Sequence, residues 1–468
     1  MSRNTVHKRE NGAGFDLVMS VFTALAAEYW LFVLLGAYVF DSINTSTMNA
    51  CRAVCVLLLC LSAVYALCRL TTLRRAGEAF KAFFKRIFCP EQLLILGILP
   101  LFVVTCAAMK SETGVDVFHY NRHYLLDACV CVLLLFPLPA MLKKYPVIPR
   151  AMLMLLVGAT FFFDAWAMVG VLKPSVVTVG GNQIGMNSHF ALCFACNENT
   201  TGAYHAMLFM LCVYFIVREK KLWVKTCFVP AVLLNLFILG LSDSRTALYS
   251  VLIAFGIVAG ALVIRFGWRR TNRLSVRVAY CGAAVFAAAA AALLIYYTPK
   301  WSYALYDAAT GYIRPVSGGG GSSESWLTGR ELLWRSFLPA VTESPRRFLF
   351  GVTPIFVEQQ ITLQGIIDAT GRSYMHNQYL QMGVAFGVPS MILYTVWTVL
   401  LAIKCVKSLK SYSGIALSGV IFMLVVANML ESYLFGFAYF CGGVFFLMAG
   451  MINADVGTED VYAEVTVR

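Results

Sequence analysis

Long apolar runs alternate with short polar segments along most of the chain, and the polar segments carry many lysines and arginines. Many of these runs are long enough, as α-helices, to cross a hydrocarbon core of about 30 Å. The pattern predicts an all-α polytopic membrane protein with about 12 transmembrane helices. The expected spans are residues 17–40, 51–68, 91–109, 124–142, 151–172, 203–217, 226–241, 247–264, 278–296, 379–403, 414–430 and 435–452.

The basic residues predict how these spans are oriented. With both termini in the cytoplasm, internal segments hold 25 of the 37 lysines and arginines, and seven of the remaining 12 lie in one long polar stretch. Short external loops then carry few basic residues, as the positive-inside rule requires, and long loops escape that rule. We therefore expect a cytoplasmic N-terminus at 1–16, spans 1–9 within 17–296, a long extracytoplasmic loop between spans 9 and 10 at 297–376, spans 10–12 within 377–452 and a cytoplasmic tail at 453–468.

The composition narrows the class of protein further. The chain is 60% hydrophobic and only 13% charged, whereas soluble domains carry roughly 25% charged residues. A net charge of +13 would suggest nucleic acid in a soluble protein, but here the basic residues lie between spans, where lipid phosphates are the nearest anions. Most of the 15 cysteines lie in apolar runs, and Cys193 and Cys196 supply two ligands, too few for a tetrahedral zinc site. That pair is expected to be structural or redox-linked.

The long polar stretch contains an amphipathic helix. Thr328 and Glu331 form a capping box at its start. Arg330 in the first turn, where the helix dipole disfavours a cation, suggests either that an anion binds there or that the arginine is simply solvated. The apolar face and the proline expected to close the helix are Leu333, Trp334, Phe337, Leu338, Val341 and then Pro345.

Two further positions carry candidate chemistry. Arg245, in Ser242-Asp243-Ser244-Arg245, borders the outer end of a predicted span, so it is an anion clamp, a snorkelling arginine or an arginine neutralised by Asp243. His376 stands where the long polar stretch meets the next apolar helix, within reach of both water and membrane. Histidine accepts a proton near neutrality, although alone at a helix end it would more often be a surface residue.

His376-Asn377, followed by nine residues and then Gly387, resembles the signature of the O-antigen ligase family, bacterial membrane enzymes that transfer glycans from a polyprenyl pyrophosphate. Where the family continues with Gly, Thr or Tyr, this chain has Ser390. Other segments are similar to further family elements: Ser244-Arg245 at a span boundary, Gly329-Arg330 with Trp334 and Arg335, Gly351, and Asn197-Glu198-Asn199, where Glu198 replaces a proline.

The resemblance implies a glycosyltransferase in the bacterial cytoplasmic (inner) membrane, with its site open to the periplasm or cell exterior. The predicted outer segments hold no Asp-x-Asp pair to bind a divalent cation, so we expect a metal-independent enzyme. The donor would be a glycan on undecaprenyl pyrophosphate. His376 would be the catalytic base, Arg245 and Arg330 would bind the donor pyrophosphate, and Asn377, Arg335 and Asn199 would support them. No cofactor and no nucleic-acid partner are expected. A glycan, lipid or protein acceptor stays open, so ligase, polysaccharide polymerase and protein O-oligosaccharyltransferase are alternatives within the family. A transporter of polysaccharide or lipid-linked sugar is the alternative from another class, because Glu28 and Asp164 lie within predicted spans.

Overall fold

The computed structural model describes most of the predicted helices and part of the polar connections. The described residues are 17–33, 35, 50, 52–54, 56–58, 60, 61, 64, 90–113, 117–135, 138, 142, 145–172, 177–179, 182–186, 192–194, 198–263, 274–311, 330–353, 375–432 and 440–455. The Gly/Ser segment at 317–325, Thr328, Cys196 and the residues beyond 455 lie outside them.

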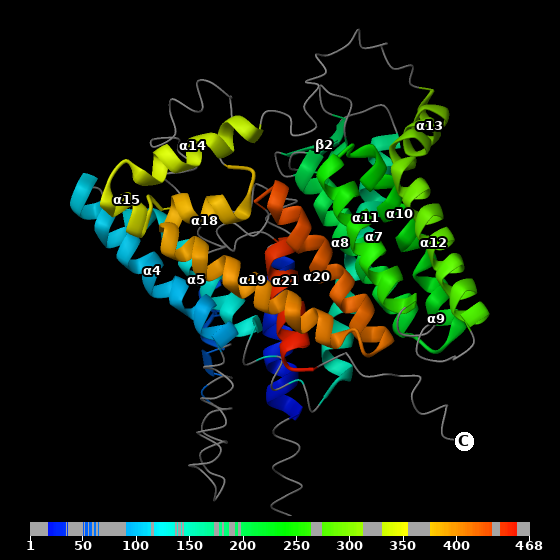
Figure 1. Cartoon of the computed structure of the whole chain (residues 1–468), viewed down its shortest axis with the longest axis horizontal. Helices are drawn as coiled ribbons and strands as arrows, with labels where there is room; N and C mark the ends of the chain where they lie inside the picture. Colours follow the sequence, from blue (N-terminus) through cyan, green and yellow to red (C-terminus); the bar gives the residue numbers. More distant parts are fainter. Residues whose placement is uncertain are drawn as a thin grey trace, which may run out of the picture.

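Helices dominate the described residues. Along the chain they are α4 (Pro90–Thr113), α5 (Val117–Leu135), α7 (Val147–Leu172), α8 (Glu198–Arg218), α9 (Leu222–Cys227), α10 (Val229–Leu241), α11 (Arg245–Leu262), α12 (Leu274–Tyr296), α13 (Thr298–Thr310), α14 (Arg330–Thr342), α15 (Pro345–Phe350), α18 (Gln378–Phe386), α19 (Val388–Ser408), α20 (Tyr412–Leu430) and α21 (Phe440–Asn453). Leu17–Val33 forms a further apolar helix. Figure 1 shows the long helices side by side in one bundle, with α13, α14 and β2 at one end and α9 at the other.

The long helices have the composition of membrane spans. Among the described residues, five helical segments are long and apolar enough to cross a membrane: Val147–Val169, Glu198–Arg218, Leu222–Leu241, Val388–Ser408 and Tyr412–Leu430. Large apolar side chains on the outside of the bundle, such as Phe162, Trp166 and Phe286, are exposed. Exposed apolar surface of this extent is stable in lipid and unstable in water. The predicted helical membrane protein is confirmed at this level, and the number of spans stays a prediction.

The centre of the bundle is formed by α8, α11 and α20, which pack side by side (Figure 1). Gly419 on α20 permits this approach, because a Cβ there would lie 2.6 Å from Val258 of α11 and 3.0 Å from Met210 of α8. Small residues at helix crossings let backbones approach closely inside a membrane. Helices α8, α20 and α21 contribute the largest shares of buried apolar side chains to the surrounding core.

A small antiparallel sheet adds to the expected all-α fold. It precedes α8 and has the order β1 (Val177–Val179), β2 (Asn182–Met186) and β3 (Leu192–Phe194). Val177 pairs with Ile184, which pairs in turn with Phe194. Sequence analysis treats 173–203 as a plain external loop. Its β-branched and aromatic residues instead form short strands, which the helical period of the flanking spans does not reveal.

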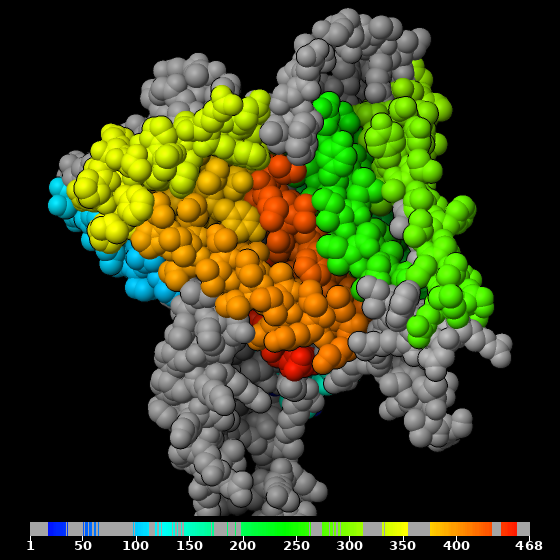
Figure 2. Space-filling view, in the orientation of Figure 1, coloured from blue at the N-terminus to red at the C-terminus, as the bar shows by residue number. Residues whose placement is uncertain are grey.

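Two local expectations are wrong. The predicted helix at 379–403 is two helices, α18 and α19, because Gly387 has φ = 86° and Pro389 follows in the first turn of α19. Pro345 does not close α14, which ends at Thr342, but opens α15 behind the N-cap Ser344. On the predicted apolar face of α14, Leu338 is 64% exposed while Leu333, Phe337 and Val341 are buried. In Figure 2, α14 and α15 (yellow) cover one end of α18 and α19 (orange).

Candidate functional site

Helix α18 accounts for the spacing between His376-Asn377 and Gly387. Asn377 is its N-cap, and the side-chain oxygen accepts hydrogen bonds from the N–H groups of Tyr379 (3.0 Å) and Leu380 (3.2 Å). The nine residues between the signature positions form the helix itself. Gly387 ends it in the left-handed half of φ space, where a side chain would be strained. The signature is therefore a cap, a helix of fixed length and a stop.

His376 lies directly before this cap in an unusual conformation. Its φ is 46°, an uncommon value for a residue other than glycine. The peptide groups of the preceding residue are held on both sides: the Met375 N–H donates to the side-chain oxygen of Gln381 (2.8 Å), and the Met375 carbonyl accepts from Trp334 Nε1 (3.1 Å). Helices α18 and α14 together thus fix the backbone at His376, which is 8% exposed.

Glu431 joins His376 to Arg330. Its Oε2 lies 2.7 Å from Nδ1 of the histidine, and its Oε1 accepts a hydrogen bond from Nη2 of the arginine. All three residues are buried, at 3% exposure for Glu431, 7% for Arg330 and 8% for His376. A carboxylate can only accept hydrogen bonds, so Nδ1 is the protonated nitrogen in the neutral imidazole and Nε2 is its basic nitrogen.

The end of α20 is tied to the start of α18, and this brings Glu431 to the histidine. The carbonyl of Glu431 accepts from the N–H of Gln378 (3.1 Å), and Nδ2 of Asn377 donates to the carbonyl of Met429 (2.9 Å). Asn377 therefore has two tasks, since its oxygen caps α18 and its nitrogen anchors α20. The supporting role expected for this residue in the reaction stays a prediction.

Two glycines let the chain cross itself beneath the site. Gly351, with φ = 66°, and Gly387 lie on two backbones that touch: a Cβ on Gly351 would be 2.5 Å from the Ala385 carbonyl carbon, and one on Gly387 would be 2.2 Å from the Leu349 oxygen. The N–H of Thr353 donates to the Ala385 carbonyl at 2.8 Å. The close approach of the segment after α15 to the end of α18 requires both glycines.

Arg330 already has an anionic partner within the chain. The position of Arg330 in the first turn of α14 suggests that an anion could bind there. In the structure, the carboxylate of Glu431 is bound to the arginine at this position. The arginine keeps spare capacity, because within the described part of the chain its buried Nε has no hydrogen-bond partner. A guanidinium with one edge on a carboxylate can present its remaining N–H groups to a second anion.

Arg245 lies at the start of α11 with its side chain exposed. The N-cap Ser244 accepts from the N–H of Ala247 and donates its hydroxyl to Oδ1 of Asn199 in the first turn of α8 (3.2 Å). Gly202 permits this contact, since a Cβ there would be 2.4 Å from the Ser244 Cβ. Asn199 thus supports the helix start that carries Arg245.

The residues around His376 and the residues around Arg245 lie at the same end of the bundle. Helix α8 begins after β3 and ends before α9, and Figure 1 shows β2 and α14 at one end and α9 at the opposite end. Arg330 belongs to α14 and binds Glu431, while Asn199 and Arg245 mark the starts of α8 and α11. Within the described residues, the hydrogen bonds and ion pairs around His376 form one network, and Arg245 does not belong to it.

Arg335 is exposed, five positions beyond Arg330, and is not part of the network. Glu431 is the residue that sequence analysis misses, because it is treated only as a polar position in the short turn after a predicted span. Its one signal is that an acidic residue follows the long apolar run 412–430 directly. Within the described residues, no three His, Cys, Asp or Glu side chains are grouped so that they could hold a metal ion.

The arrangement can perform base chemistry. A carboxylate behind Nδ1 fixes the imidazole tautomer and stabilises the imidazolium that forms when Nε2 takes a proton, as in other histidine–carboxylate pairs. The positive charge of Arg330 balances the carboxylate, which makes the buried group tolerable.

Residues 230–395 match the family model described as O-antigen ligase. The predicted family resemblance is thereby confirmed, over a segment that contains Arg245, Arg330 and His376 and ends before Glu431. No curated protein matches the chain.

Proposed function

Taking the O-antigen ligase family segment at 230–395 as the premise, we propose that the chain transfers a glycan from undecaprenyl pyrophosphate to an acceptor hydroxyl at the outer face of the bacterial cytoplasmic membrane. The family supports a glycosyltransferase of the ligase or polymerase type in a membrane. The donor and the outward orientation are our proposals. The observation that carries the chemistry is the contact between His376 Nδ1 and the carboxylate of Glu431 at 2.7 Å.

In the proposed reaction, Nε2 of His376 takes the proton of the acceptor hydroxyl. The hydroxyl oxygen then attacks the anomeric carbon of the donor sugar, the bond between that carbon and the pyrophosphate oxygen breaks, and undecaprenyl pyrophosphate leaves with the electron pair. Glu431 stabilises the imidazolium during this step. Inversion at the anomeric carbon is what the family resemblance implies.

The leaving pyrophosphate needs positive charge close to it. We assign this task to Arg245 and Arg330. Arg245 is exposed at the bundle end that carries the site, and the buried Nε of Arg330 has no hydrogen-bond partner within the described residues. Guanidinium groups bind phosphate oxygens in bidentate geometry and can stabilise the charge that develops in the transition state. Asn199 acts through Ser244 as a support for Arg245.

The acceptor separates the alternatives within the family. Lipid A core would make the protein a ligase, a second lipid-linked glycan would make it a polymerase, and a protein hydroxyl would make it an O-oligosaccharyltransferase. A transporter is the rival from another class. It is favoured by Glu28, which is 4% exposed, and by buried Asp164, whose Oδ2 lies 3.7 Å from His205 Nδ1 inside the bundle.

The decisive experiment measures transfer of a labelled glycan from undecaprenyl pyrophosphate to acceptor in proteoliposomes. The His376→Ala variant should insert and fold, bind donor and lose about 10²–10⁴ in turnover, the usual worth of a positioned acid–base group. His119 lies on α5 and has no role in the proposed reaction, so His119→Ala is the histidine control and should transfer glycan normally.

Four outcomes would contradict the proposal. Equal transfer by wild type and His376→Ala, or a greater loss in His119→Ala, would remove His376 from the reaction. Movement of the lipid-linked glycan across the membrane without a covalent product would favour the transporter. Activity abolished by EDTA and restored by magnesium would overturn the metal-independent mechanism.

A further inference from the structure

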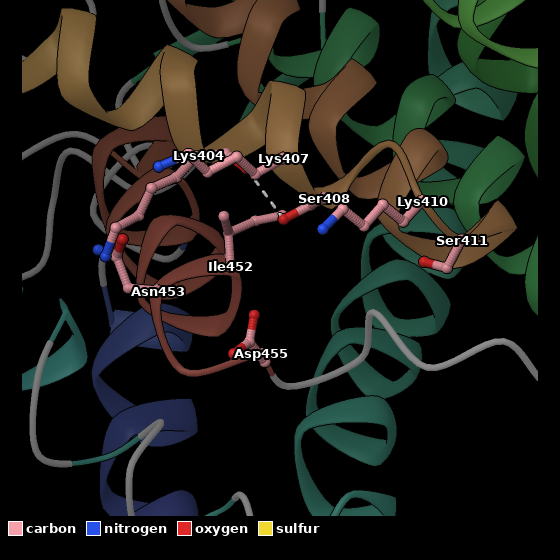
Figure 3. A pocket seen from close by; sticks show the side chains of 8 residues that line it. All are labelled: Lys404, Lys407, Ser408, Lys410, Ser411, Ile452, Asn453 and Asp455. Atoms are coloured by element: carbon pink, nitrogen blue, oxygen red, sulfur yellow. Dashed lines mark hydrogen bonds between the residues drawn. The ribbon is translucent and has the colours of Figure 1, made fainter. Parts of the chain in front are cut away.

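A second charged site lies at the opposite end of α20 from Glu431. It is a pocket of about 350 Å³, and Figure 3 shows it from close by. It is formed by the end of α19, the turn into α20 and the end of α21; its lining residues are Lys404, Lys407, Ser408, Lys410, Ser411, Ile452, Asn453 and Asp455.

Helix α20 fixes the distance between the pocket and the candidate active site. Ser411, which lines the pocket, is the N-cap of α20, and Glu431 directly follows its last residue. The 19 residues of the helix rise by about 1.5 Å each, or about 28 Å in total, close to the thickness of a hydrocarbon core. The pocket therefore lies at the level of the lipid headgroups on the face opposite His376.

The pocket gathers positive charge in a way that topology alone does not require. Three lysines face one aspartate, and the N-terminus of α20 adds the positive end of its helix dipole. The positive-inside rule explains lysines on this face, and the dipole of α19 favours Lys407 in its last turn. Neither explains why Asn453, 43 positions beyond Lys410 along the chain, meets them around one cavity.

The acceptors in the pocket add a second requirement. The Lys404 side chain extends towards Asn453, and Asp455 lies across the pocket from Ser408 and Lys410 (Figure 3). Within the described residues, Oδ1 of Asn453 is buried and has no hydrogen-bond partner. Asn453 and Asp455 can accept hydrogen bonds, while the lysines and Ser408 can donate to phosphate oxygens. The preferred ligand therefore combines an anionic phosphate with a hydroxyl or ammonium donor.

We propose that this pocket binds the phosphodiester headgroup of an anionic phospholipid in the leaflet opposite the active site. The phosphate would lie among Lys404, Lys407 and Lys410, and a headgroup hydroxyl would donate to Asn453 or Asp455. Free inorganic phosphate shares part of this chemistry. It lacks the acyl chains that hold a lipid at this depth, and it lacks the alcohol group of the headgroup that would donate to the acceptors. The site does not depend on the transfer reaction.

The test titrates the full-length protein in detergent with phosphatidylglycerol, phosphatidylcholine or inorganic phosphate, and reads retained ligand by native mass spectrometry. Phosphatidylglycerol should be retained in preference to phosphatidylcholine, which has no hydrogen-bond donor. Each lysine changed to glutamine should weaken phosphatidylglycerol binding by about fivefold. The pocket variants are Lys407→Gln, Lys410→Gln and the triple variant that adds Lys404→Gln. The matched control, with the same loss of charge beside α9, is Lys220→Gln/Lys221→Gln/Lys225→Gln.

Each outcome decides the proposal. Loss of phosphatidylglycerol in the pocket variants, with the control triple variant like the wild type, supports a headgroup site. Equal losses in both triple variants mean diffuse charge attraction and overturn the site. Binding of inorganic phosphate as tight as that of phosphatidylglycerol overturns the lipid as its ligand. The exposed single variant Lys407→Gln should fold normally, so wild-type retention by it, despite a misfolded triple variant, would also contradict the proposal.

Discussion

The carboxylate of Glu431 lies 2.7 Å from Nδ1 of His376, although 55 positions separate the two residues in the chain. The contact depends on α20, which ends directly before the glutamate, and on α18, whose N-cap residue directly follows the histidine. Because Glu431 also binds Arg330, one carboxylate connects the candidate base to the helix α14 of the long polar stretch. The first prediction concerns this pair.

Glu431→Gln should keep a hydrogen-bond acceptor for Nδ1 but remove the charge that stabilises the imidazolium. Glycan transfer should therefore fall, by less than in His376→Ala. Glu431→Ala should fall further, and the double variant Glu431→Ala/His376→Ala should be about as inactive as His376→Ala alone, because residues that act as a unit are not additive. The measurement is turnover for all four variants in proteoliposomes. Additive losses would show that Glu431 does not act through the histidine.

Arg245 and Arg330 should respond differently to substitution, since only Arg330 has a buried carboxylate partner. Arg245→Ala should reduce transfer and leave the thermal unfolding midpoint unchanged. Arg330→Gln should reduce both, because removing one partner of a buried ion pair costs about 3–5 kcal/mol. Lysine should not fully restore activity at either position, because it lacks the bidentate geometry. Wild-type turnover in the Arg→Lys variants would show that the bidentate geometry of the two arginines is not needed for transfer.

Asn377 should contribute to stability through two separable contacts. Asn377→Ala should destabilise the protein by about 1–2 kcal/mol, the usual cost of losing an N-cap together with a side-chain hydrogen bond. Asn377→Asp is the matched control, because aspartate caps α18 equally well but cannot donate to the Met429 carbonyl. Thermal unfolding in detergent should rank the wild type above the aspartate variant and the alanine variant last. Equal midpoints for all three would mean that the cap carries no stability.

Topology is the fourth prediction. Residues 297–376 should lie outside the cytoplasm and both termini inside. In a cysteine-depleted variant, an impermeant thiol reagent should label Ser322→Cys from outside and leave Ser408→Cys unlabelled. The first of these positions lies outside the described residues and the second lines the lysine pocket. Labelling in the reverse order would overturn the orientation, the location of the active site and the leaflet assigned to the phospholipid.

Local patterns predict the helices and part of the site, while contacts between distant segments escape them. The apolar runs at 151–172 and 414–430 predict α7 and α20 to within a few residues, because a buried or lipid-facing helix needs apolar residues along its whole length. His376 and Asn377 are predicted because they belong to one short signature. Glu431 is not, since its partners come from two distant segments, α14 and the residue before the cap of α18. The roles expected for His376, Asn377, Arg245, Arg330, Arg335 and Asn199 stay predictions.

The glycines illustrate the same boundary. Gly351 and Gly387 are each singled out by resemblance, but only the fold shows that the two backbones touch where a side chain on either would collide. The break between α18 and α19 follows from that crossing as well as from the local preference of glycine. Periodicity predicts one continuous helix there, because both helices are apolar and no residue between them is charged.

The nine-residue length of α18 makes this part of the chain far more sensitive to insertions and deletions than to substitutions. Many side chains could serve on the helix, provided that the cap and the stop remain in place. One residue more or less, however, would turn His376 by about 100° relative to the glycine crossing and shift it by about 1.5 Å along the axis. The imidazole would then leave Glu431, with every chemical group still present. In related chains, the count between histidine and glycine should therefore persist longer than the identity of the residues that fill it.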